Sequence, residues 1–137
     1  MRHASILGVA LALLAGPAPA QAPGPADKPT ATVQRVFGER LPNAPGKSLT
    51  AVVVDFPPGV VSPPHHHAGA VFVYVLSGAV RSQLGGGEAK VYRAGETFFE
   101  PPGSHHVYSA SASTTEPARI LAVFVADDGA TLTTYDK

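Results

Sequence analysis

The chain has 137 residues, with ten Lys and Arg against ten Asp and Glu, and it contains no cysteine. This balance of charge provides no basic surface for nucleic acid or for an anionic membrane. The lack of cysteine excludes disulfide bonds and a cysteine-linked lipid anchor, and the length fits one domain of ordinary size.

Residues 1–20 have the features of a secretory signal peptide. Arg2 precedes an apolar run at residues 4–15, which is shorter than the roughly 20 residues that span a bilayer. Small residues then suit cleavage after Ala20 or Ala22. We therefore expect an exported bacterial protein, periplasmic or secreted, without a membrane anchor. Residues 21–31, rich in Pro, Ala and Gly, are expected to form a flexible segment that leads into a single domain at 32–137.

The remainder of the chain has the pattern of an all-β domain. Short segments rich in Val, Phe, Tyr and Thr alternate with turns of Gly, Pro and Asp, and no window shows a helical period. The predicted strands cover residues 33–39, 49–56, 70–76, 79–84, 89–92, 97–100, 106–109 and 120–126. Short strands at this spacing are typical of a sandwich or a barrel.

Five of the six histidines form two clusters, at residues 65–67 and 105–106. Because side chains alternate along a strand, His65 and His67 are expected on one face and His66 on the other. Imidazole is a common ligand of transition metals, and a site needs three or four donors from separate stretches of chain. The clusters predict a divalent-metal site. The simpler alternative, a His-rich surface loop, does not account for the second cluster.

The spacing of these residues resembles the two sequence motifs of the cupin superfamily, in its small single-domain bacterial form. The matching positions of the first motif are Gly59, His65, His67 and Gly78, and those of the second are Gly95, Pro101, Gly103 and His106. This resemblance implies an antiparallel jelly-roll barrel. It also implies that His65, His67 and His106 are metal ligands.

Two positions depart from the cupin pattern. Val71 stands where the first motif has a glutamate, and Ala110 stands where an asparagine often closes the second. The resemblance therefore implies a three-histidine site, as in some cupin dioxygenases of thiols and diketones, with one divalent transition metal per chain. Ligand type alone does not choose among iron, manganese, nickel, copper and zinc. Three neutral imidazoles leave the full charge of the ion on the site, which favours an anionic substrate or a water of lowered pKa.

Four further residues are candidates for the surroundings of the ion. Glu100 lies within an apolar strand, where a carboxylate needs a partner. It is interpreted as a replacement oxygen donor, as a catalytic acid or base, or as an ordinary carboxylate paired with an arginine. Gln83, His105 and Tyr108 are candidates for the pocket or for contact with the ligands, although His105 flanks a ligand and is expected to point away from it.

The sequence thus predicts a metal-dependent cupin enzyme of dioxygenase type that acts on a small chelating or enolisable molecule. Two alternatives stay open: a non-catalytic module that binds a metal or a small ligand, and a non-oxidative isomerase or lyase. A homodimer is also expected, because jelly rolls of this family commonly pair through edge strands and the apolar runs at 71–76 and 120–125 suit mutual packing.

Overall fold

The computed structural model describes residues 30–137 of the chain. The signal peptide expected at 1–20 and nearly all of the flexible segment at 21–31 lie outside the described residues, so both stay predictions. Within residues 30–137 there is no helix, and hence none long and apolar enough to cross a membrane.

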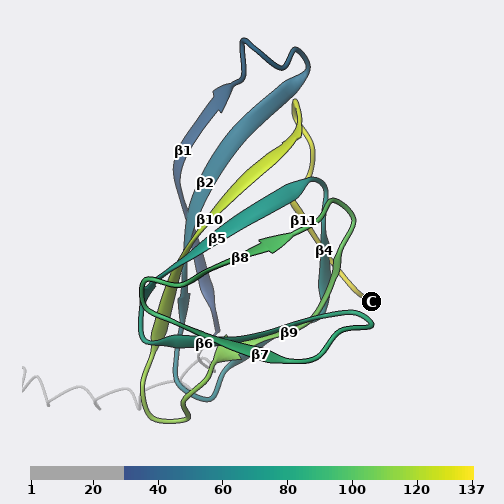
Figure 1. Ribbon diagram of the computed structural model, residues 1–137. Helices are drawn as coiled ribbons and strands as arrows, with labels where there is room; N and C mark the ends of the chain where they lie inside the picture. The colour runs from purple at the N-terminus through teal and green to yellow at the C-terminus, as the bar shows by residue number, and fades with distance from the viewer. Residues whose placement is uncertain (1–29) are drawn as a thin grey trace, which may run out of the picture.

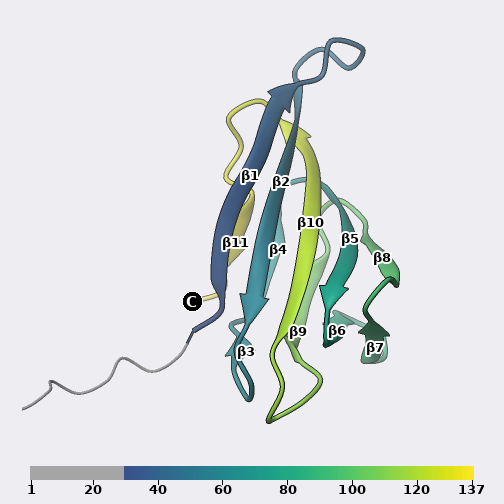
Figure 2. The same ribbon diagram turned by 90° about the vertical axis from the view of Figure 1, so that its left-hand side faces the viewer.

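The described residues form eleven strands. Their bounds are β1 Thr32–Arg40, β2 Lys47–Phe56, β3 Val61–Ser62, β4 His65–His67, β5 Ala70–Ser77, β6 Ala79–Leu84, β7 Lys90–Arg93, β8 Thr97–Glu100, β9 His105–Ser111, β10 Ala118–Asp127 and β11 Thr133–Tyr135. They form two antiparallel sheets (Figures 1 and 2). One sheet has the order β1-β2-β10-β5-β8, and the other has the order β11-β4-β9-β6-β7 with β3 beside β9. The expected antiparallel jelly roll is confirmed.

The core lies between the two sheets and follows from the two-residue alternation of the strands. On β5, Val71, Val73 and Val75 are buried, whereas Phe72 and Tyr74 face outward. The same alternation on β10 buries Ala118, Ile120, Ala122, Phe124 and Ala126. This apolar interior holds the two sheets together and surrounds the histidines.

All eight predicted strands are present, with ends that differ by at most two residues. Three strands, β3, β4 and β11, are missing from the sequence prediction. β4 consists of three histidines after two prolines, and β11 is Thr133–Tyr135, so neither shows an apolar alternation. Both are strands because they pair with their neighbours, β4 with β9 and β11 with β4.

The apolar runs at 71–76 and 120–125 have a different role from the one expected. They lie in β5 and β10, which are hydrogen-bonded neighbours inside one sheet, and neither is an edge strand. Their pairing with each other therefore belongs to the sheet of one chain, while the outward side chains of Phe72, Tyr74 and Leu76 on β5 stay exposed.

Gly78, in the tight turn between β5 and β6, offers a test of this packing. Its φ of +68° is a left-handed conformation, and a Cβ at this position would overlap the carbonyl oxygen of Pro117. Gly46 also has a positive φ, of +82°, but nothing lies within 4 Å of its Cβ position. We expect Gly78→Ala to lower the free energy of unfolding by more than about 2 kcal/mol and Gly46→Ala by about 1 kcal/mol, measured by urea denaturation. Equal losses would show that the close approach at Gly78 does not exist.

Candidate metal centre

The two histidine clusters meet between the sheets. His65 on β4 lies directly opposite His106 on β9 in the strand register. His65, His67 and His106 are 7%, 9% and 4% exposed, while His66 faces outward, so the alternation expected from the sequence is confirmed. One nitrogen from each buried ring lies within 4.8 Å of the others. The three rings line a small cavity of about 80 Å³.

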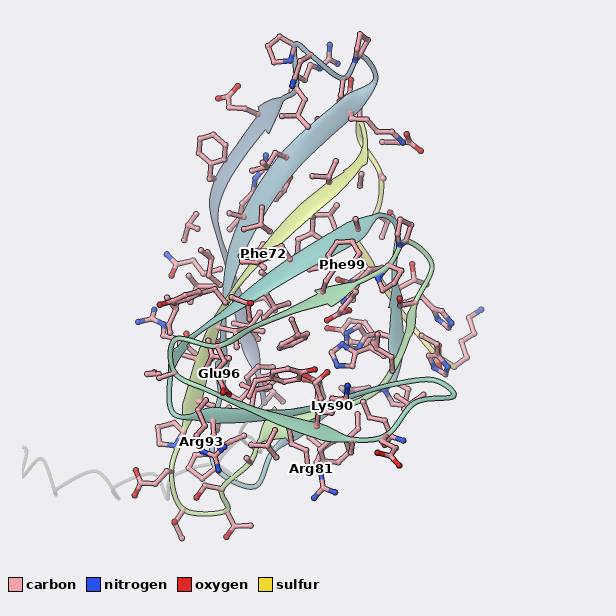
Figure 3. The ribbon with its side chains drawn as sticks, in the orientation of Figure 1. Phe72, Arg81, Lys90, Arg93, Glu96 and Phe99 are labelled. Atoms are coloured by element: carbon pink, nitrogen blue, oxygen red, sulfur yellow. The ribbon has the colours of Figure 1, made fainter. Side chains whose placement is uncertain are left out.

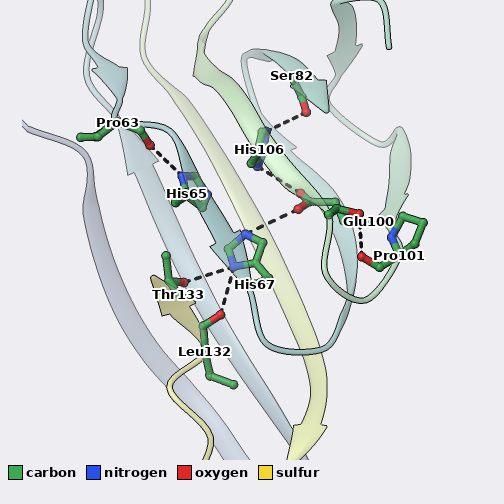
Figure 4. Close-up of polar contacts among 10 residues, drawn as sticks. Pro63, His65, His67, Ser82, Glu100, Pro101, His106, Leu132 and Thr133 are labelled. Atoms are coloured by element: carbon green, nitrogen blue, oxygen red, sulfur yellow. Dashed lines mark hydrogen bonds and ion pairs between the residues drawn. The ribbon is translucent and has the colours of Figure 1, made fainter. Parts of the chain in front are cut away.

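Backbone carbonyl groups orient the rings of His65 and His67 (Figure 4). The Nδ1 atom of His65 lies 2.8 Å from the carbonyl oxygen of Pro63, and that of His67 lies 3.2 Å from the carbonyl oxygen of Leu132. The Thr133 hydroxyl lies 3.2 Å from the same nitrogen of His67. An Nδ1–H that donates to a carbonyl leaves the lone pair on Nε2, which is the tautomer that a metal ligand requires.

The ring of His106 is oriented through its Nε2 atom rather than through Nδ1. Its Nε2 lies 2.9 Å from the hydroxyl oxygen of Ser82 on β6. Its Nδ1 is buried, has no hydrogen-bond partner and faces Glu100 at 3.4 Å. His106 therefore presents Nδ1 to the cavity.

Glu100 is the fourth polar group of the cavity. It is the last residue of β8, is 2% exposed and lies directly opposite Val71 in the register. Its Oε2 is 3.5 Å from the Nε2 of His67, and like His106 Nδ1 it lacks a hydrogen-bond partner. The strand pairing thus brings a carboxylate beside the position where the cupin motif would have its glutamate.

The distances around Glu100 suit ligands of a shared ion better than hydrogen bonds. Hydrogen bonds between nitrogen and oxygen are usually about 2.7–3.2 Å long. Two donors bonded to one zinc-like ion at about 2.1 Å lie about 3.0–3.4 Å apart, depending on the coordination geometry. The separations of 3.4 and 3.5 Å are close to the upper end of that range. Three imidazoles and one carboxylate therefore fit a divalent transition metal.

Burial shifts the ionisation of all four groups. It lowers the pKa of His65, lowers that of His67 to about 4 and lowers that of His106 to about 3, with repulsion from neighbouring histidines as a further cause. It raises the pKa of Glu100 to about 7. In the metal-free protein just below neutral pH, the contacts of Glu100 with His67 and His106 therefore join neutral groups rather than an ion pair.

Three sequence candidates lie elsewhere. The amide of Gln83 donates to the carbonyl oxygen of Gly87, outside the cavity. Tyr108 packs beneath Arg81 instead of lining the cavity, because an extra residue on β9 opposite Gln83 and Leu84 interrupts the alternation. His105 lies on the outer face, where its Nε2 is 2.7 Å from Asp136.

The contacts made by Ser82, Leu132 and Thr133 were not predicted from the sequence. Ser82 follows Arg81, whose side chain faces outward. The alternation of side chains along β6 therefore predicts that the Ser82 side chain points inward. Leu132 and Thr133 reach His67 only because β11 pairs with β4, a long-range contact without a local signal.

Glu100 and the imidazoles give the metal-free protein opposite dependences on pH. The Glu100 carboxyl ionises near pH 4.5 in the unfolded chain but near pH 7 in the folded one, so its contribution to stability is present below pH 4.5 and is lost as the pH rises through about 7. The contribution of His67 is present above its ordinary pKa of 6.5 and is lost as the pH falls through about 4.

We expect the difference in free energy of unfolding between wild type and Glu100→Gln to decline on the order of 3 kcal/mol from acid to neutral pH. Because both proteins contain the same histidines, subtracting one free energy of unfolding from the other removes the contributions of the histidines. Urea denaturation in the presence of a chelator measures the difference, and a difference that does not change with pH would contradict the buried, uncharged state of Glu100.

Comparison with known proteins places this geometry in a family. A DMSP lyase of Ruegeria pomeroyi DSS-3 has a TM-score of 0.62 and 24% identity, covering 77% of this chain and 51% of the lyase. A cupin-like protein of Thermotoga maritima MSB8 has a TM-score of 0.61 and 19% identity, covering 77% of this chain and 75% of that protein. An oxalate decarboxylase of Bacillus subtilis has a TM-score of 0.55 and 22% identity, covering 64% and 23% respectively.

At these identities the likeness shows the fold alone, and the chain spans about half the length of the lyase. No curated protein matches the sequence. The Cupin domain family matches residues 52–124, which include all three buried histidines and Glu100. This match covers more than half of the chain, which therefore belongs to the cupin family.

Proposed function

We propose that the protein is a metal-dependent enzyme that holds one divalent transition metal between His65, His67 and His106 and acts on a small molecule. The observation that carries the proposal is the pair of buried atoms without hydrogen-bond partners, Glu100 Oε2 and His106 Nδ1. Leaving such atoms unpaired costs about 1–3 kcal/mol each, and a shared cation removes that cost. A purely structural cavity would not require this arrangement.

In this proposal Glu100 has two roles, one for each oxygen of its carboxylate. One oxygen completes the donor set that the three imidazoles begin. The other oxygen would take a proton from the substrate. When bound, the ion supplies a Lewis acid and open coordination positions. The Ser82 and Leu132 contacts keep the rings of His106 and His67 in place during the reaction.

The cavity lining indicates the class of substrate. Apart from the three histidines and Glu100, it consists mainly of Val, Ala, Ile and Phe side chains, and no Lys or Arg of the described residues is among them. No side-chain cation is therefore available there to bind a substrate carboxylate. The best fit is a small molecule with an apolar body and one chelating or enolisable group that reaches the ion.

The proposed reaction is a dioxygenation, the class expected from the sequence. A non-oxidative elimination or isomerisation is the second candidate, and the position of Glu100 favours it, because a base beside a Lewis acid suffices to remove a proton next to a carbonyl group. We further propose that the protein acts after export, guided by the signal peptide expected at 1–20.

The metal site can be tested with His67→Ala. The wild-type protein, purified without a tag, is expected to bind one iron, manganese, nickel or copper ion per chain at the inner site, and His67→Ala is expected to lose it. The bound ion should stabilise wild type by about 3 kcal/mol at 100 times its dissociation constant. Elemental analysis and thermal unfolding with and without chelator measure both effects. Unchanged metal content and stability in His67→Ala would refute the site.

An oxygen electrode then separates the two reaction classes. With simple diketones and thiols, a dioxygenase consumes oxygen as substrate disappears, and Glu100→Gln should lower turnover by about 10²–10⁴-fold. Substrate loss without oxygen uptake would support the non-oxidative enzyme. Metal binding without turnover of either kind would leave a binding module and contradict the proposed catalysis.

We also propose a homodimer, formed through the outer face of β5 and β8. Phe72 and Phe99 lie opposite each other in the register and are 45% and 58% exposed (Figure 3). Tyr74 and Leu76, which are also exposed on β5, extend the apolar patch. β8 is an edge strand among the described residues, so a second copy can cover both the patch and the edge.

Light scattering coupled to size exclusion tests this pairing. Wild type is expected to have the mass of two chains, and the double variant Phe72→Ser, Phe99→Ser that of one. Val91→Ser removes a similarly exposed apolar side chain from β7 and serves as the control. A monomeric wild type, or a double variant that stays dimeric, would rule out this face as the interface.

A further inference from the structure

A second group of metal-ligating side chains lies on the outer face of the sheet that holds the inner histidines. His66 on β4 and His105 on β9 are directly opposite each other in the register. Because their neighbours His65, His67 and His106 point inward, these two side chains must point outward. Directly opposed residues have Cβ atoms about 4.5–5.5 Å apart, so the strand pairing itself brings the two imidazoles together.

The third member, Asp136, comes from the C-terminal end of the described chain. Its backbone N–H donates to the carbonyl oxygen of Pro64 at 3.0 Å, which fixes the residue just beyond β11. Its Oδ1 lies 3.1 Å from His66 Nδ1, and its Oδ2 lies 2.7 Å from His105 Nε2. Three separate segments thus contribute one donor each, and all three donor atoms lie within 4.8 Å of one another.

We infer that His66, His105 and Asp136 form a second divalent-metal site, distinct from the inner one and open to solvent. Two neutral imidazoles and one carboxylate are a donor set that zinc accepts, with water in the fourth position. Two donors bonded to one zinc ion lie about 3.0–3.4 Å apart, and the 3.1 Å between Asp136 Oδ1 and His66 Nδ1 is within that range. The 2.7 Å between Asp136 Oδ2 and His105 Nε2 is a hydrogen-bond length, and this contact has to open when the ion binds. The single negative charge of Asp136 partly neutralises the ion.

The side chains have the freedom to accept the ion. The two rings are stacked, with centroids 4.3 Å apart and planes inclined by 7°. An ion bonded to both nitrogens must lie close to the plane of each ring, so at least one ring has to tilt. The side chains of His66, His105 and Asp136 are 47%, 37% and 37% exposed, which leaves room for that rotation.

An ion at this site would connect three strands. It would fasten the end of β11 to β4 and β9, and the Leu132 and Thr133 groups that orient His67 lie at the start of β11 and directly before it. The outer site would thereby stabilise the C-terminal strand that supports the inner site. The proposal itself does not depend on catalysis or on metal binding at the inner site.

Titration calorimetry with zinc chloride tests the inference on the full domain. After removal of bound metal with a chelator, wild type is expected to bind one zinc ion per chain more than His105→Ala. In a His67→Ala background, adding Asp136→Asn should weaken the remaining zinc site by more than about 10-fold, since even residues that only orient a ligand are worth 10–100-fold in affinity. Glu88→Gln removes an exposed carboxylate outside the cluster and is the matched control.

The pattern of losses separates this site from the inner one. If His105→Ala leaves the number of bound zinc ions unchanged, or if Glu88→Gln weakens binding as much as Asp136→Asn, the outer site does not exist. If the His67→Ala variant loses a zinc ion and His105→Ala does not, the lost ion belongs to the inner site. Should His67→Ala fail to fold, the comparison of wild type with His105→Ala still decides, because both keep the inner donors.

Discussion

The burial of an unpartnered carboxyl group among three imidazoles is the constraint on which the rest of this structure depends. Glu100 is 2% exposed, and no Lys or Arg of the described residues lines its cavity. An ionised carboxylate in such surroundings is costly unless a cation accompanies it. Either the group keeps its proton, as its pKa of about 7 indicates for the metal-free protein, or an ion binds between it and the histidines. The same burial keeps the imidazoles neutral and able to act as ligands.

The apolar framework serves this arrangement by holding each donor from a different direction. β4 and β9 present His65 and His106 as directly opposed residues, and β8 brings Glu100 from the facing sheet. Hydrogen bonds to Pro63, Ser82 and Leu132 then set the orientation of each ring. A donor set held in place before the ion arrives loses little conformational entropy on binding, and this is the main contribution of the two sheets to the proposed metal site.

Local patterns predicted an all-β domain and placed His65 and His67 on one face. The jelly roll and the choice of His106 were implied by the resemblance to the cupin motifs. The contacts of Glu100 depend on strand register, and the role of β11 on pairing between segments about 65 residues apart, which no local pattern reveals. Tyr108 was misplaced because one extra residue on β9 reverses its direction. The pairing of β5 with β10 within one sheet could not be predicted either. Two apolar strands have the same sequence pattern whether they pair within one chain or between two chains.

We propose that His65, His67, His106 and Glu100 bind one ion together. Anomalous diffraction from crystals grown with one equivalent of manganese, nickel or zinc, recorded at the absorption edge of the metal, tests it most directly. We expect a peak within about 2.0–2.3 Å of one nitrogen from each ring and of one Glu100 oxygen. A cavity without a peak, or a peak bonded to the imidazoles with the Glu100 carboxyl turned away and still protonated, would contradict it.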